Sequence, residues 1–450
     1  MSAFFYALIA TVAYLFNPYA GFGIFCAITT IIHLRADGSP LYRNLKLLAI
    51  SMPLFMAPVL PGLPVMGSWT SLFLVLVAVQ LARRSFGFGA LDLYLLVVFV
   101  LGTLVTTLQS NGGIREVYYS TQIALLVFPP SLALIARKHR ESLMTRDEHN
   151  HLLFAVSGAI AASGTAVVFQ WLLATRLGLS LGHIAFFQNR VSYDLLIPAY
   201  SALSALLSIG LPLGPVLWRM GKKFAAVALP VLCGIAIVIN SSRTGFAAGA
   251  IGLAVILLFP PRGANRVGNV LLLIPASAFV IWLFNKVTDS SRFKSASLWS
   301  ANGRFETYTA GYELWTKYPR YFLFGRGYAN YPTIPPHNFI LETLVCSGLI
   351  VALALAVVIV RFIRFTWGTS WCYLIVTYLT AGMFFSGFYN FKPLAILLVI
   401  SICCANPVED RRGGQDTSRS KTQKTSLPTI STEAQPGKPG DRISRRRLTL

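Results

Sequence analysis

Residues 335–360 read PPHNFILETLVCSGLIVALALAVVIV, and this stretch decides the class of fold. Two prolines and a histidine precede an apolar run that is long enough to cross a bilayer as a helix, which needs roughly 20 residues. The run closes the one long polar interval between hydrophobic segments, residues 286–336. A membrane protein with a single large loop of this kind usually has its chemistry in that loop.

The composition of the whole chain agrees with a membrane location. Of the 450 residues, 55% are hydrophobic and 12% are charged, and the mean hydropathy is +0.63. These values exclude an ordinary soluble domain. Apolar runs alternate with short connectors along the chain, so we expect an all-α polytopic membrane protein with about 12–14 transmembrane helices and one large periplasmic loop containing short helices. The six cysteines lie in or beside apolar runs, without the spacing of a zinc site or a disulfide framework.

Basic residues between the apolar runs fall in every second connector. The clusters are Arg35/Arg43/Lys46, Arg83/Arg84, Arg137/Lys138/Arg140/Arg146, Arg219/Lys222/Lys223, Arg262/Arg266 and Arg361/Arg364. Loops rich in Lys and Arg lie on the cytoplasmic side of a membrane. The pattern therefore predicts a multi-pass protein of the bacterial inner membrane with both termini in the cytoplasm. The long polar loop then lies in the periplasm.

These boundaries divide the chain into four regions. Residues 1–285 are a transmembrane bundle, 286–336 the large periplasmic loop, 337–404 the C-terminal transmembrane helices, and 405–450 a tail. The tail is rich in Arg, Lys, Ser, Thr, Pro and Gly, which predicts a disordered basic cytoplasmic segment. It is either a solvated tail without a role in activity or a contact for anionic membrane lipids. The net charge of +22 is spread over loops, so we expect no nucleic-acid partner.

The first candidate for chemistry is the turn NSSRTG, residues 240–245, between two apolar runs. A charged Arg243 at this depth is costly unless it finds a partner or lines a wet cavity. With Ser242 and Thr244 it forms a donor-rich helix start, a setting that suits a phosphate oxygen. The alternative is an arginine that reaches out to the lipid headgroups. The sequence at this position leaves both roles open.

The second candidate lies in the polar loop, in which basic residues outnumber acidic ones. The loop is a cationic cap, and Arg304 and Arg326 are among the side chains available to an anion. The segment that starts at Arg304 favours a helix, on which Tyr308, Tyr312 and Trp315 share one aromatic face. Such a face serves for packing or as an anchor at the membrane interface. It also stacks well on sugar rings, so glycan binding by Trp315 remains open.

The third candidate is His337, where the polar loop meets the next apolar run. Asn338 and Glu342 follow at a spacing of four and share a helix face. A lone histidine is usually structural, but a neutral imidazole can take a proton from a sugar hydroxyl near neutral pH. We favour the second role because Arg243 and Arg304 are expected to face the same cavity.

Carboxylates are scarce in the loops that we expect on the periplasmic side, and no Asp-x-Asp occurs in the chain. A divalent-metal site that holds a diphosphate would therefore lack ligands. Arginines would have to neutralise the leaving group instead. A weaker candidate for contact with donor or acceptor is Arg190, in the connector 177–191. We expect neither a metal nor another cofactor.

These segments together resemble a known family. NSSRTG (240–245), NGR (302–304), FGRG (324–327) and HNFILE (337–342) are similar to segments of bacterial O-antigen ligase-like membrane proteins. The specific part of the resemblance covers about residues 235–365. It implies a metal-independent, inverting transfer of a glycan from an undecaprenyl-diphosphate-linked donor at the periplasmic face. The family includes O-antigen ligases, repeat-unit polymerases and protein O-oligosaccharyltransferases.

The same resemblance implies roles for individual residues. Arg243 and Arg304 would bind the donor diphosphate and stabilise its departure. His337 would act as general base on the acceptor hydroxyl, with Asn338 or Glu342 orienting it. The further candidates for substrate binding are Arg190, Ser242, Thr244, Trp315 and Arg326.

The hypotheses about the transferase activity differ in the acceptor that receives the glycan. An O-antigen ligase attaches its glycan to a lipid A-core acceptor, and we place this activity in lipopolysaccharide biosynthesis first. A repeat-unit polymerase or a protein O-oligosaccharyltransferase would use another hydroxyl. A transporter of lipid-linked sugars belongs to a different class, but transporters usually show inverted repeats and charges at the middle of the membrane. A non-catalytic subunit of a polysaccharide export machine is the remaining alternative.

Overall fold

The computed structural model describes most of the chain up to Cys404. The described residues are 2–35, 37–55, 57–59, 67–84, 89–109, 114–138, 143–187, 190–196, 200–260, 304–327, 336–384 and 391–404, with a few single positions between 275 and 282. The chain divides into two units, Met1–Asn406 and Pro407–Leu450, and all of these residues belong to the first. The tail predicted over 405–450 and residues 286–303 and 328–335 of the polar loop lie outside the described part.

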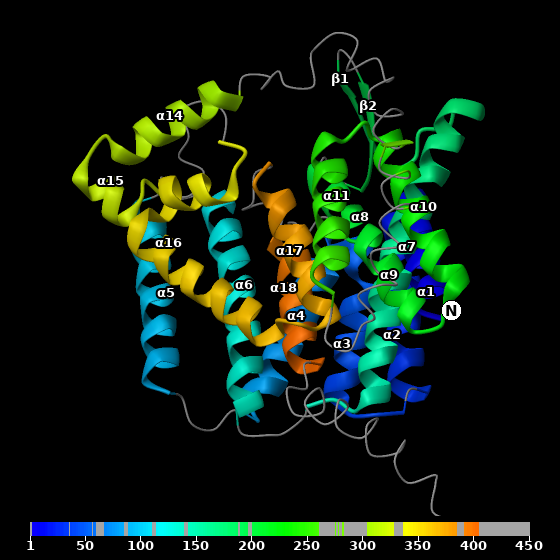
Figure 1. Ribbon diagram of the computed structural model, residues 1–450, viewed down its shortest axis with the longest axis horizontal. Helices are drawn as coiled ribbons and strands as arrows, with labels where there is room; N and C mark the ends of the chain where they lie inside the picture. Colours follow the sequence, from blue (N-terminus) through cyan, green and yellow to red (C-terminus); the bar gives the residue numbers. More distant parts are fainter. Residues whose placement is uncertain are drawn as a thin grey trace, which may run out of the picture. The chain divides into compact units, whose positions relative to one another are not determined.

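Helices form nearly all of the described chain (Figure 1). They are α1 (Ser2–Phe16), α2 (Pro18–Arg35), α3 (Pro40–Ile50), α4 (Trp69–Ala82), α5 (Ala90–Gln109), α6 (Ile114–Lys138), α7 (Arg146–Arg176), α8 (Tyr200–Ser208), α9 (Gly210–Arg219), α10 (Lys223–Ile239), α11 (Arg243–Leu258), α14 (Arg304–Thr316), α15 (Pro319–Phe324), α16 (Phe339–Thr366), α17 (Ser370–Gly382) and α18 (Phe391–Cys404). A short 3-10 turn, η1, covers Met52–Leu54.

Within the described residues, four helical stretches are long and apolar enough to cross a membrane. They are Ala90–Leu108, Arg146–Arg176, Ser201–Arg219 and Phe339–Thr366. Shorter apolar helices, among them α1, α4, α10, α11 and α18, accompany them. The predicted class, a helical membrane protein, is confirmed, whereas the total of about 12–14 spans remains a prediction. Helices α14 and α15 lie in the segment predicted as the polar loop.

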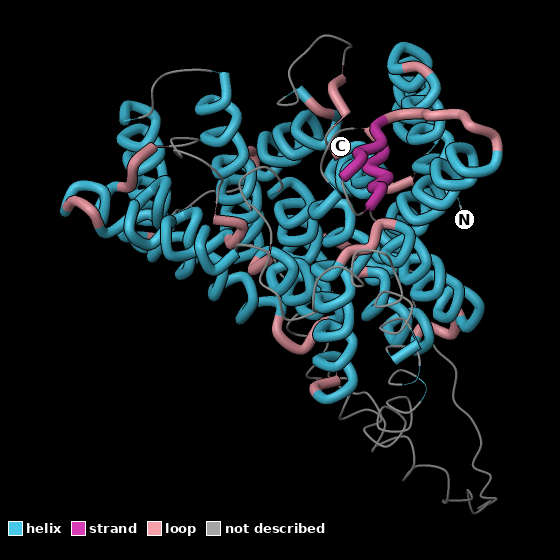
Figure 2. Tube along the Cα trace, turned by 90° about the horizontal axis from the view of Figure 1, so that it is seen from above, coloured by secondary structure: helices cyan, strands magenta, loops and turns pink. Residues whose placement is uncertain are grey.

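One described segment departs from the all-α prediction. Strands β1 (His183–Phe187) and β2 (Arg190–Leu195) form an antiparallel hairpin in which Ile184 lies opposite Tyr193. Figure 2 shows the two strands in magenta among the helices. The hairpin covers the end of the connector 177–191 and the start of the apolar run that follows it, and the short helices α8 and α9 come after it. The β-branched and aromatic residues of β2 suit a strand better than a helix, and the helical prediction for these residues was wrong.

Several contacts bring the basic connectors to one end of the first unit, called the basic end below. Trp371 Nε1 at the start of α17 lies 3.2 Å from His149 Nε2 near the start of α7. Tyr373 of α17 donates its hydroxyl to the carbonyl of Phe259, just after α11. The start of α7 and the turn between α9 and α10 line one cleft, and the loop before α3 also touches α7. Connectors that alternate along the sequence therefore meet in space.

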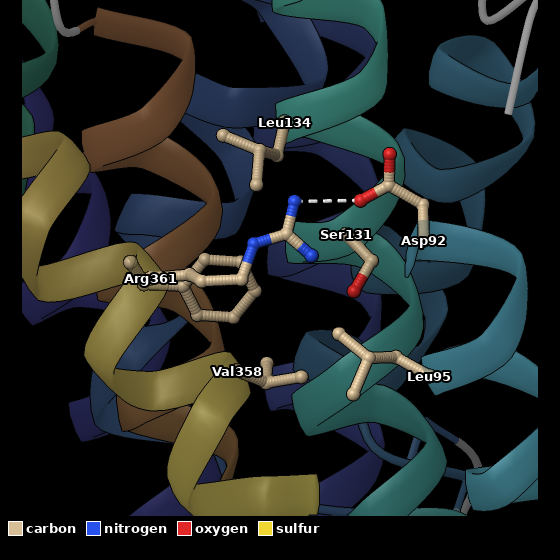
Figure 3. A pocket seen from close by; sticks show the side chains of 7 residues that line it. Asp92, Leu95, Ser131, Leu134, Val358 and Arg361 are labelled. Carbon is tan, nitrogen blue, oxygen red and sulfur yellow. Dashed lines mark hydrogen bonds and ion pairs between the residues drawn. The ribbon is translucent and has the colours of Figure 1, made fainter. Parts of the chain in front are cut away.

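A buried carboxylate joins three helices at the basic end. Asp92, in the first turn of α5 and 6% exposed, accepts from Arg361 Nη2 of α16 at 2.6 Å. Its other oxygen lies 2.5 Å from Lys138 Nζ of α6. Figure 3 shows the Arg361 side chain pointing from α16 towards Asp92, beside Ser131 of α6. The ion pairs fasten the last turns of α6 and α16 to the first turn of α5, where the helix dipole also favours a carboxylate.

Helix α16 bends at Gly348, whose φ of 75° and ψ of 178° are not helical. Because of the bend, the carbonyls of Val345 and Cys346 lose the N–H donors that a regular α-helix would give them. The backbone N–H of Arg326 donates to Val345 O at 2.8 Å, and that of Gly327 donates to Cys346 O at 3.0 Å. In a membrane an unpaired carbonyl costs several kcal/mol. The segment after α15 therefore completes the hydrogen bonding of α16.

Two glycines allow the approach of these backbones. A Cβ on Gly348 would overlap the carbonyl oxygen of Leu323, and a Cβ on Gly325 would overlap that of Cys346. Both glycines have positive φ, 75° and 76°, a region in which other residues are strained. Helix α15 consequently lies directly against the bend of α16.

We predict that Gly348→Ala destabilises the protein by more than about 1 kcal/mol, because alanine in a left-handed conformation alone costs roughly that much and its Cβ also overlaps Leu323. The matched control is Gly23→Ala on α2, where a Cβ would meet nothing within 4 Å. Thermal unfolding of the two purified variants in the same detergent measures the difference. Equal unfolding temperatures for both variants would contradict the proposed contact at the bend.

Candidate functional site

The predicted site residues lie at the end of the first unit opposite the basic end, called the far end below. Helices α11 and α16 both finish at the basic end, at Phe259 and Arg361. Their first residues, Arg243 and Phe339, therefore lie towards the far end. The hairpin β1–β2 and helix α14 are drawn at the top of Figure 1, at this same end.

A tight turn places Arg243 at the first position of α11. Ser241 has a left-handed φ of 45°, and the N–H of Ser242 donates to Ile237 O at 3.1 Å, which ends α10. Ser242 Oγ then accepts from the N–H of Gly245 at 3.2 Å and caps α11. The serine oxygen is therefore engaged as an acceptor in capping α11, and this cap does not use the hydroxyl proton.

The guanidinium of Arg243 belongs largely to the protein interior. Its Nε and Nη2 atoms are buried, and its neighbours Ser242 and Thr244 are 3% and 7% exposed. An arginine that reached for lipid headgroups would leave these nitrogens accessible to solvent. The burial favours the other role considered for this residue, a cation held beside the start of a helix.

Two buried amides fasten the hairpin to the helices. Asn240, which directly precedes the Arg243 turn, accepts from the N–H of Tyr193 at 2.8 Å and donates to its carbonyl at 3.3 Å. Gln170 of α7 accepts from the N–H of Leu195 at 3.2 Å and donates to the carbonyl of His183 at 3.0 Å. Sequence reasoning gave neither amide a role, although an amide within an apolar run is a signal for a buried hydrogen-bonding partner.

The hairpin carries a second polar cluster. Asp194, 5% exposed, accepts from Ser192 Oγ at 2.6 Å, and His183 Nδ1 lies 3.3 Å from its other oxygen. Burial raises the pKa of the Tyr193 hydroxyl. Arg190, predicted to contact a substrate, is the first residue of β2 and pairs with Phe187. Its side chain lies outside the described part of the structure.

His337 takes an unusual backbone conformation just before α16, with a φ of 41°. The next residue, Asn338, caps the helix, because its Oδ1 accepts from the N–H groups of Ile340 at 3.0 Å and Leu341 at 3.1 Å. Its Nδ2 donates to the carbonyl of Met383 at 3.2 Å, just after α17. Asn338 therefore fixes the backbone next to the imidazole and ties α16 to α17.

Glu342 lies in the first turn of α16 and is 1% exposed. Its N–H donates to the carbonyl of Asn338 at 2.8 Å, so the two residues predicted on one face are neighbours. Asn338, however, is a cap that precedes the helix. A carboxylate in the first turn is favoured by the helix dipole.

Helix α14 begins with Arg304, as the sequence predicts, and packs on the start of α16. A Cβ at Gly311 would lie 3.1 Å from Pro336 and from the side chain of Leu341. Arg304 precedes Gly311 by seven residues, roughly 10 Å along the helix. Its side chain lies outside the described part of the structure.

The aromatic residues of α14 serve mainly to hold α15. The ring of Trp315 stacks on Phe322 with centroids 4.8 Å apart and planes at 18°, and its Nε1 donates to Phe322 O at 3.0 Å. One face of the indole is therefore already covered, whereas Tyr312 is 56% exposed. The guanidinium of Arg326 lies 5.8 Å from the centroid of the Tyr321 ring. The backbone N–H of Arg326 donates to the carbonyl of Val345 in α16. Val345 lies roughly 12 Å from His337 along that helix.

Helix α17 lies between the two candidate elements. Its Thr377 packs so closely on α11 that a Cβ at Gly252 would overlap the threonine hydroxyl. At its other end, Gly382 approaches the ring of Phe339 at the start of α16. The structure thus brings the Arg243 turn, the hairpin and the His337 segment to one end through α17, Asn240 and Asn338.

Backbone strain gathers at this end. In the described part of the chain the non-glycine residues with positive φ are Leu195, Ser241 and His337, which lie at the end of β2, in the Arg243 turn and before α16. Such conformations cost roughly 1–3 kcal/mol each and cluster at functional sites.

A further buried cation was not assigned from the sequence. Lys392 of α18 is 0% exposed, and its Nζ donates to Phe55 O at 3.0 Å and to Ser68 Oγ at 2.9 Å. The signal was available, since a lysine within an apolar run is costly without partners. The lysine fastens the start of α18 to the connector before α4.

No family model matches the sequence, and no curated protein matches it either. The function of the far end therefore has to be argued from its residues.

We predict that Asn240→Ala releases the hairpin locally. The substitution leaves the N–H and carbonyl of Tyr193 without the amide that pairs them, and loss of a buried partner costs about 1–3 kcal/mol. Hydrogen exchange measured by mass spectrometry should speed up at 190–196 in this variant. In Asn17→Ala, which removes an amide that accepts from Tyr19 N–H in an exposed turn, exchange at the hairpin should stay unchanged. Unchanged exchange in both variants would show that Asn240 does not hold the hairpin.

Proposed function

We propose that this protein is a membrane glycan transferase that moves a glycan from an undecaprenyl-diphosphate donor to an acceptor hydroxyl. The observation that carries the proposal is the convergence at the far end: the partly buried guanidinium of Arg243, the helix that begins with Arg304, and the strained His337. The resemblance of these same segments to O-antigen ligase-like proteins adds to it.

Cations are the groups at the far end suited to a diphosphate. Of the carboxylates described there, Asp194 bonds to Ser192 and faces His183, and Glu342 is buried in α16. Glu306 and Glu313 are exposed on α14. Arginine binds phosphate oxygens through two parallel N–H bonds. Charge fixed in a partly buried site stabilises a leaving diphosphate without reorganisation during the reaction. Arg243 and Arg304 are assigned this role.

The reaction is a displacement at the anomeric carbon. His337 takes the proton of the acceptor hydroxyl, whose oxygen forms the new glycosidic bond as the bond from carbon to the diphosphate oxygen breaks. The electron pair leaves with the diphosphate, and the configuration at carbon inverts. Asn338 supports the base by fixing the backbone after it. The step uses no metal ion.

Membrane orientation follows from the basic end. Clusters of Lys and Arg face the cytoplasm, so the basic end and both termini are assigned to the cytoplasm and the far end to the periplasm of the inner membrane. A lipid-linked donor is within reach of a site at that membrane surface. A lipid A-core acceptor makes the protein an O-antigen ligase, and a second repeat unit or a protein hydroxyl makes it a polymerase or an O-oligosaccharyltransferase.

Deletion of the gene in the bacterium that encodes it separates these acceptors. We expect the lipopolysaccharide gel to lose its long-chain ladder while lipid-linked polymer accumulates, which identifies a ligase. A remaining band with one repeat unit identifies a polymerase. An unchanged gel excludes lipopolysaccharide as the acceptor.

We predict that His337→Ala lowers the rate of transfer by roughly 10²–10⁴, the usual effect of losing a general base, and that Arg243→Ala and Arg304→Ala also abolish detectable transfer. His33→Ala and Arg364→Ala are the controls, because both side chains lie at the basic end, at the ends of α2 and α16. Complementation of the deletion strain, with protein level checked by immunoblot, measures the effect. Full activity of all three far-end variants would overturn the assignment.

We predict that transfer by the purified protein persists in EDTA, because arginines and not a divalent cation neutralise the diphosphate. The measurement is the yield of glycan product from a lipid-linked donor with and without the chelator. A strict need for added magnesium would refute the role given to the arginines.

A further inference from the structure

A cleft at the basic end lies outside the site described above. It has a volume of about 440 Å³, within the range of small-molecule sites, roughly 300–1,000 Å³. It lies between the start of α7 and the turn that joins α9 to α10. Its lining residues are Arg146, Asp147, Asn150, His151, Phe154, Arg219, Met220 and Lys222.

The charges of the cleft favour an anion. Arg146 from the start of α7, and Arg219 and Lys222 from the α9–α10 turn, converge on it against one carboxylate, Asp147. The ammonium of Lys222 is 5.6 Å from the centroid of the Phe154 ring. Arginine and lysine together supply both forked and point-like donors for phosphate oxygens.

The helix ends do not explain Arg146 and Lys222. Arg146 is the first residue of α7, where the helix dipole disfavours a positive charge. Lys222 stands at the cap position of α10 without a capping side-chain bond. Gly221, with a φ of 75°, allows the N–H of Lys222 to reach Leu217 O at 3.0 Å. This closes a tight turn that sets Lys222 close to the end of α9.

The cleft lies at the depth of lipid headgroups. Arg146 and Arg219 are terminal residues of two helical stretches that are long enough to cross the membrane. Trp218, beside the cleft, is 44% exposed, and tryptophan is enriched at membrane–water interfaces. These positions place the cations at the boundary between the apolar bundle and water.

An apolar strip continues from the cleft along α10. Phe224 is 87% exposed, Val227 57% and Val231 39%. Their spacing of three and four residues puts them on one face of the helix. A cationic cleft that opens onto an exposed apolar helix face matches the two parts of a phospholipid, its headgroup and its acyl chains.

We propose that this cleft binds an anionic glycerophospholipid of the phosphatidylglycerol class. Arg146, Arg219 and Lys222 hold the phosphate, Asp147 accepts a hydrogen bond from a headgroup hydroxyl, and the acyl chains lie along α10. Basic pockets between membrane helices on the cytoplasmic side bind anionic headgroups in this way. The site is independent of glycan transfer at the far end.

The test is thermal unfolding of the full-length protein in detergent, followed by intrinsic fluorescence, because a ligand that binds only the folded state raises the unfolding temperature. Dioleoylphosphatidylglycerol should raise it more than the same amount of dioleoylphosphatidylcholine. In Arg219→Gln/Lys222→Gln at least half of this difference should be lost. In Arg83→Gln/Arg364→Gln, which removes the same charge from the same end outside the cleft, the difference should be retained.

Two outcomes would overturn the proposal. If the difference in unfolding temperature between the two lipids is the same in both double variants, the lipid is attracted diffusely to the basic end and not bound in the cleft. A rise of the same size with inorganic phosphate alone means a site for a free anion and not for a lipid. If the cleft double variant does not fold, Arg146→Gln decides, since its side chain is exposed at a helix start. Native mass spectrometry should then show at least a twofold loss of retained phosphatidylglycerol relative to wild type, and unchanged retention would refute the site.

Discussion

The fold of the C-terminal half depends on two backbone carbonyls that need donors within an apolar helix. The bend at Gly348 changes the hydrogen bonding of Val345 and Cys346, and the N–H groups of Arg326 and Gly327 meet them. In a bilayer no water replaces such donors. The segment from α14 to Gly327 is therefore held against α16 through its backbone and not through surface charge. Because α14 also packs near Pro336, the same constraint brings the helix of Arg304 to the start of α16, next to His337.

The coarse organisation could be predicted from sequence because it follows from composition. Apolar run lengths gave the membrane class, and the alternation of basic connectors identified those that meet around Asp92 and at the start of α17. The helix beginning at Arg304 followed from its local propensity. The hairpin was missed because β1 falls in the connector 177–191 and β2 continues into a longer apolar run, where apolar residues alone do not separate strand from helix. The bend at Gly348 was equally hidden, since a glycine inside an apolar run does not reveal which backbone will approach it.

The candidate residues at the far end were chosen from the sequence by residue type, but the contacts that support them were not predicted. Asn240 and Gln170 form hydrogen bonds with backbone groups of the hairpin, and Asn338 donates to the backbone carbonyl of Met383. These contacts join segments that are distant in sequence, so they exist only in the folded chain. All three supports are neutral amides. Each satisfies a donor and an acceptor together, so the hairpin, the Arg243 turn and the start of α16 are fixed without an added carboxylate that would compete with a phosphate for the arginine.

The exposed arginines of the basic end and the buried nitrogens of Arg243 lie in different physical settings. At the basic end, Arg83 and Arg364 are exposed, and water and salt screen their attraction for anions over about 8–10 Å. At the far end, Nε and Nη2 of Arg243 are buried, and its turn is held by a cap on each side. A charge in such a medium attracts a diphosphate more strongly than a charge in water does. Because the guanidinium is already held in place, it does not have to be ordered when an anion binds. The positive φ angles of Ser241 and His337 are strained backbone of the kind that clusters at functional sites.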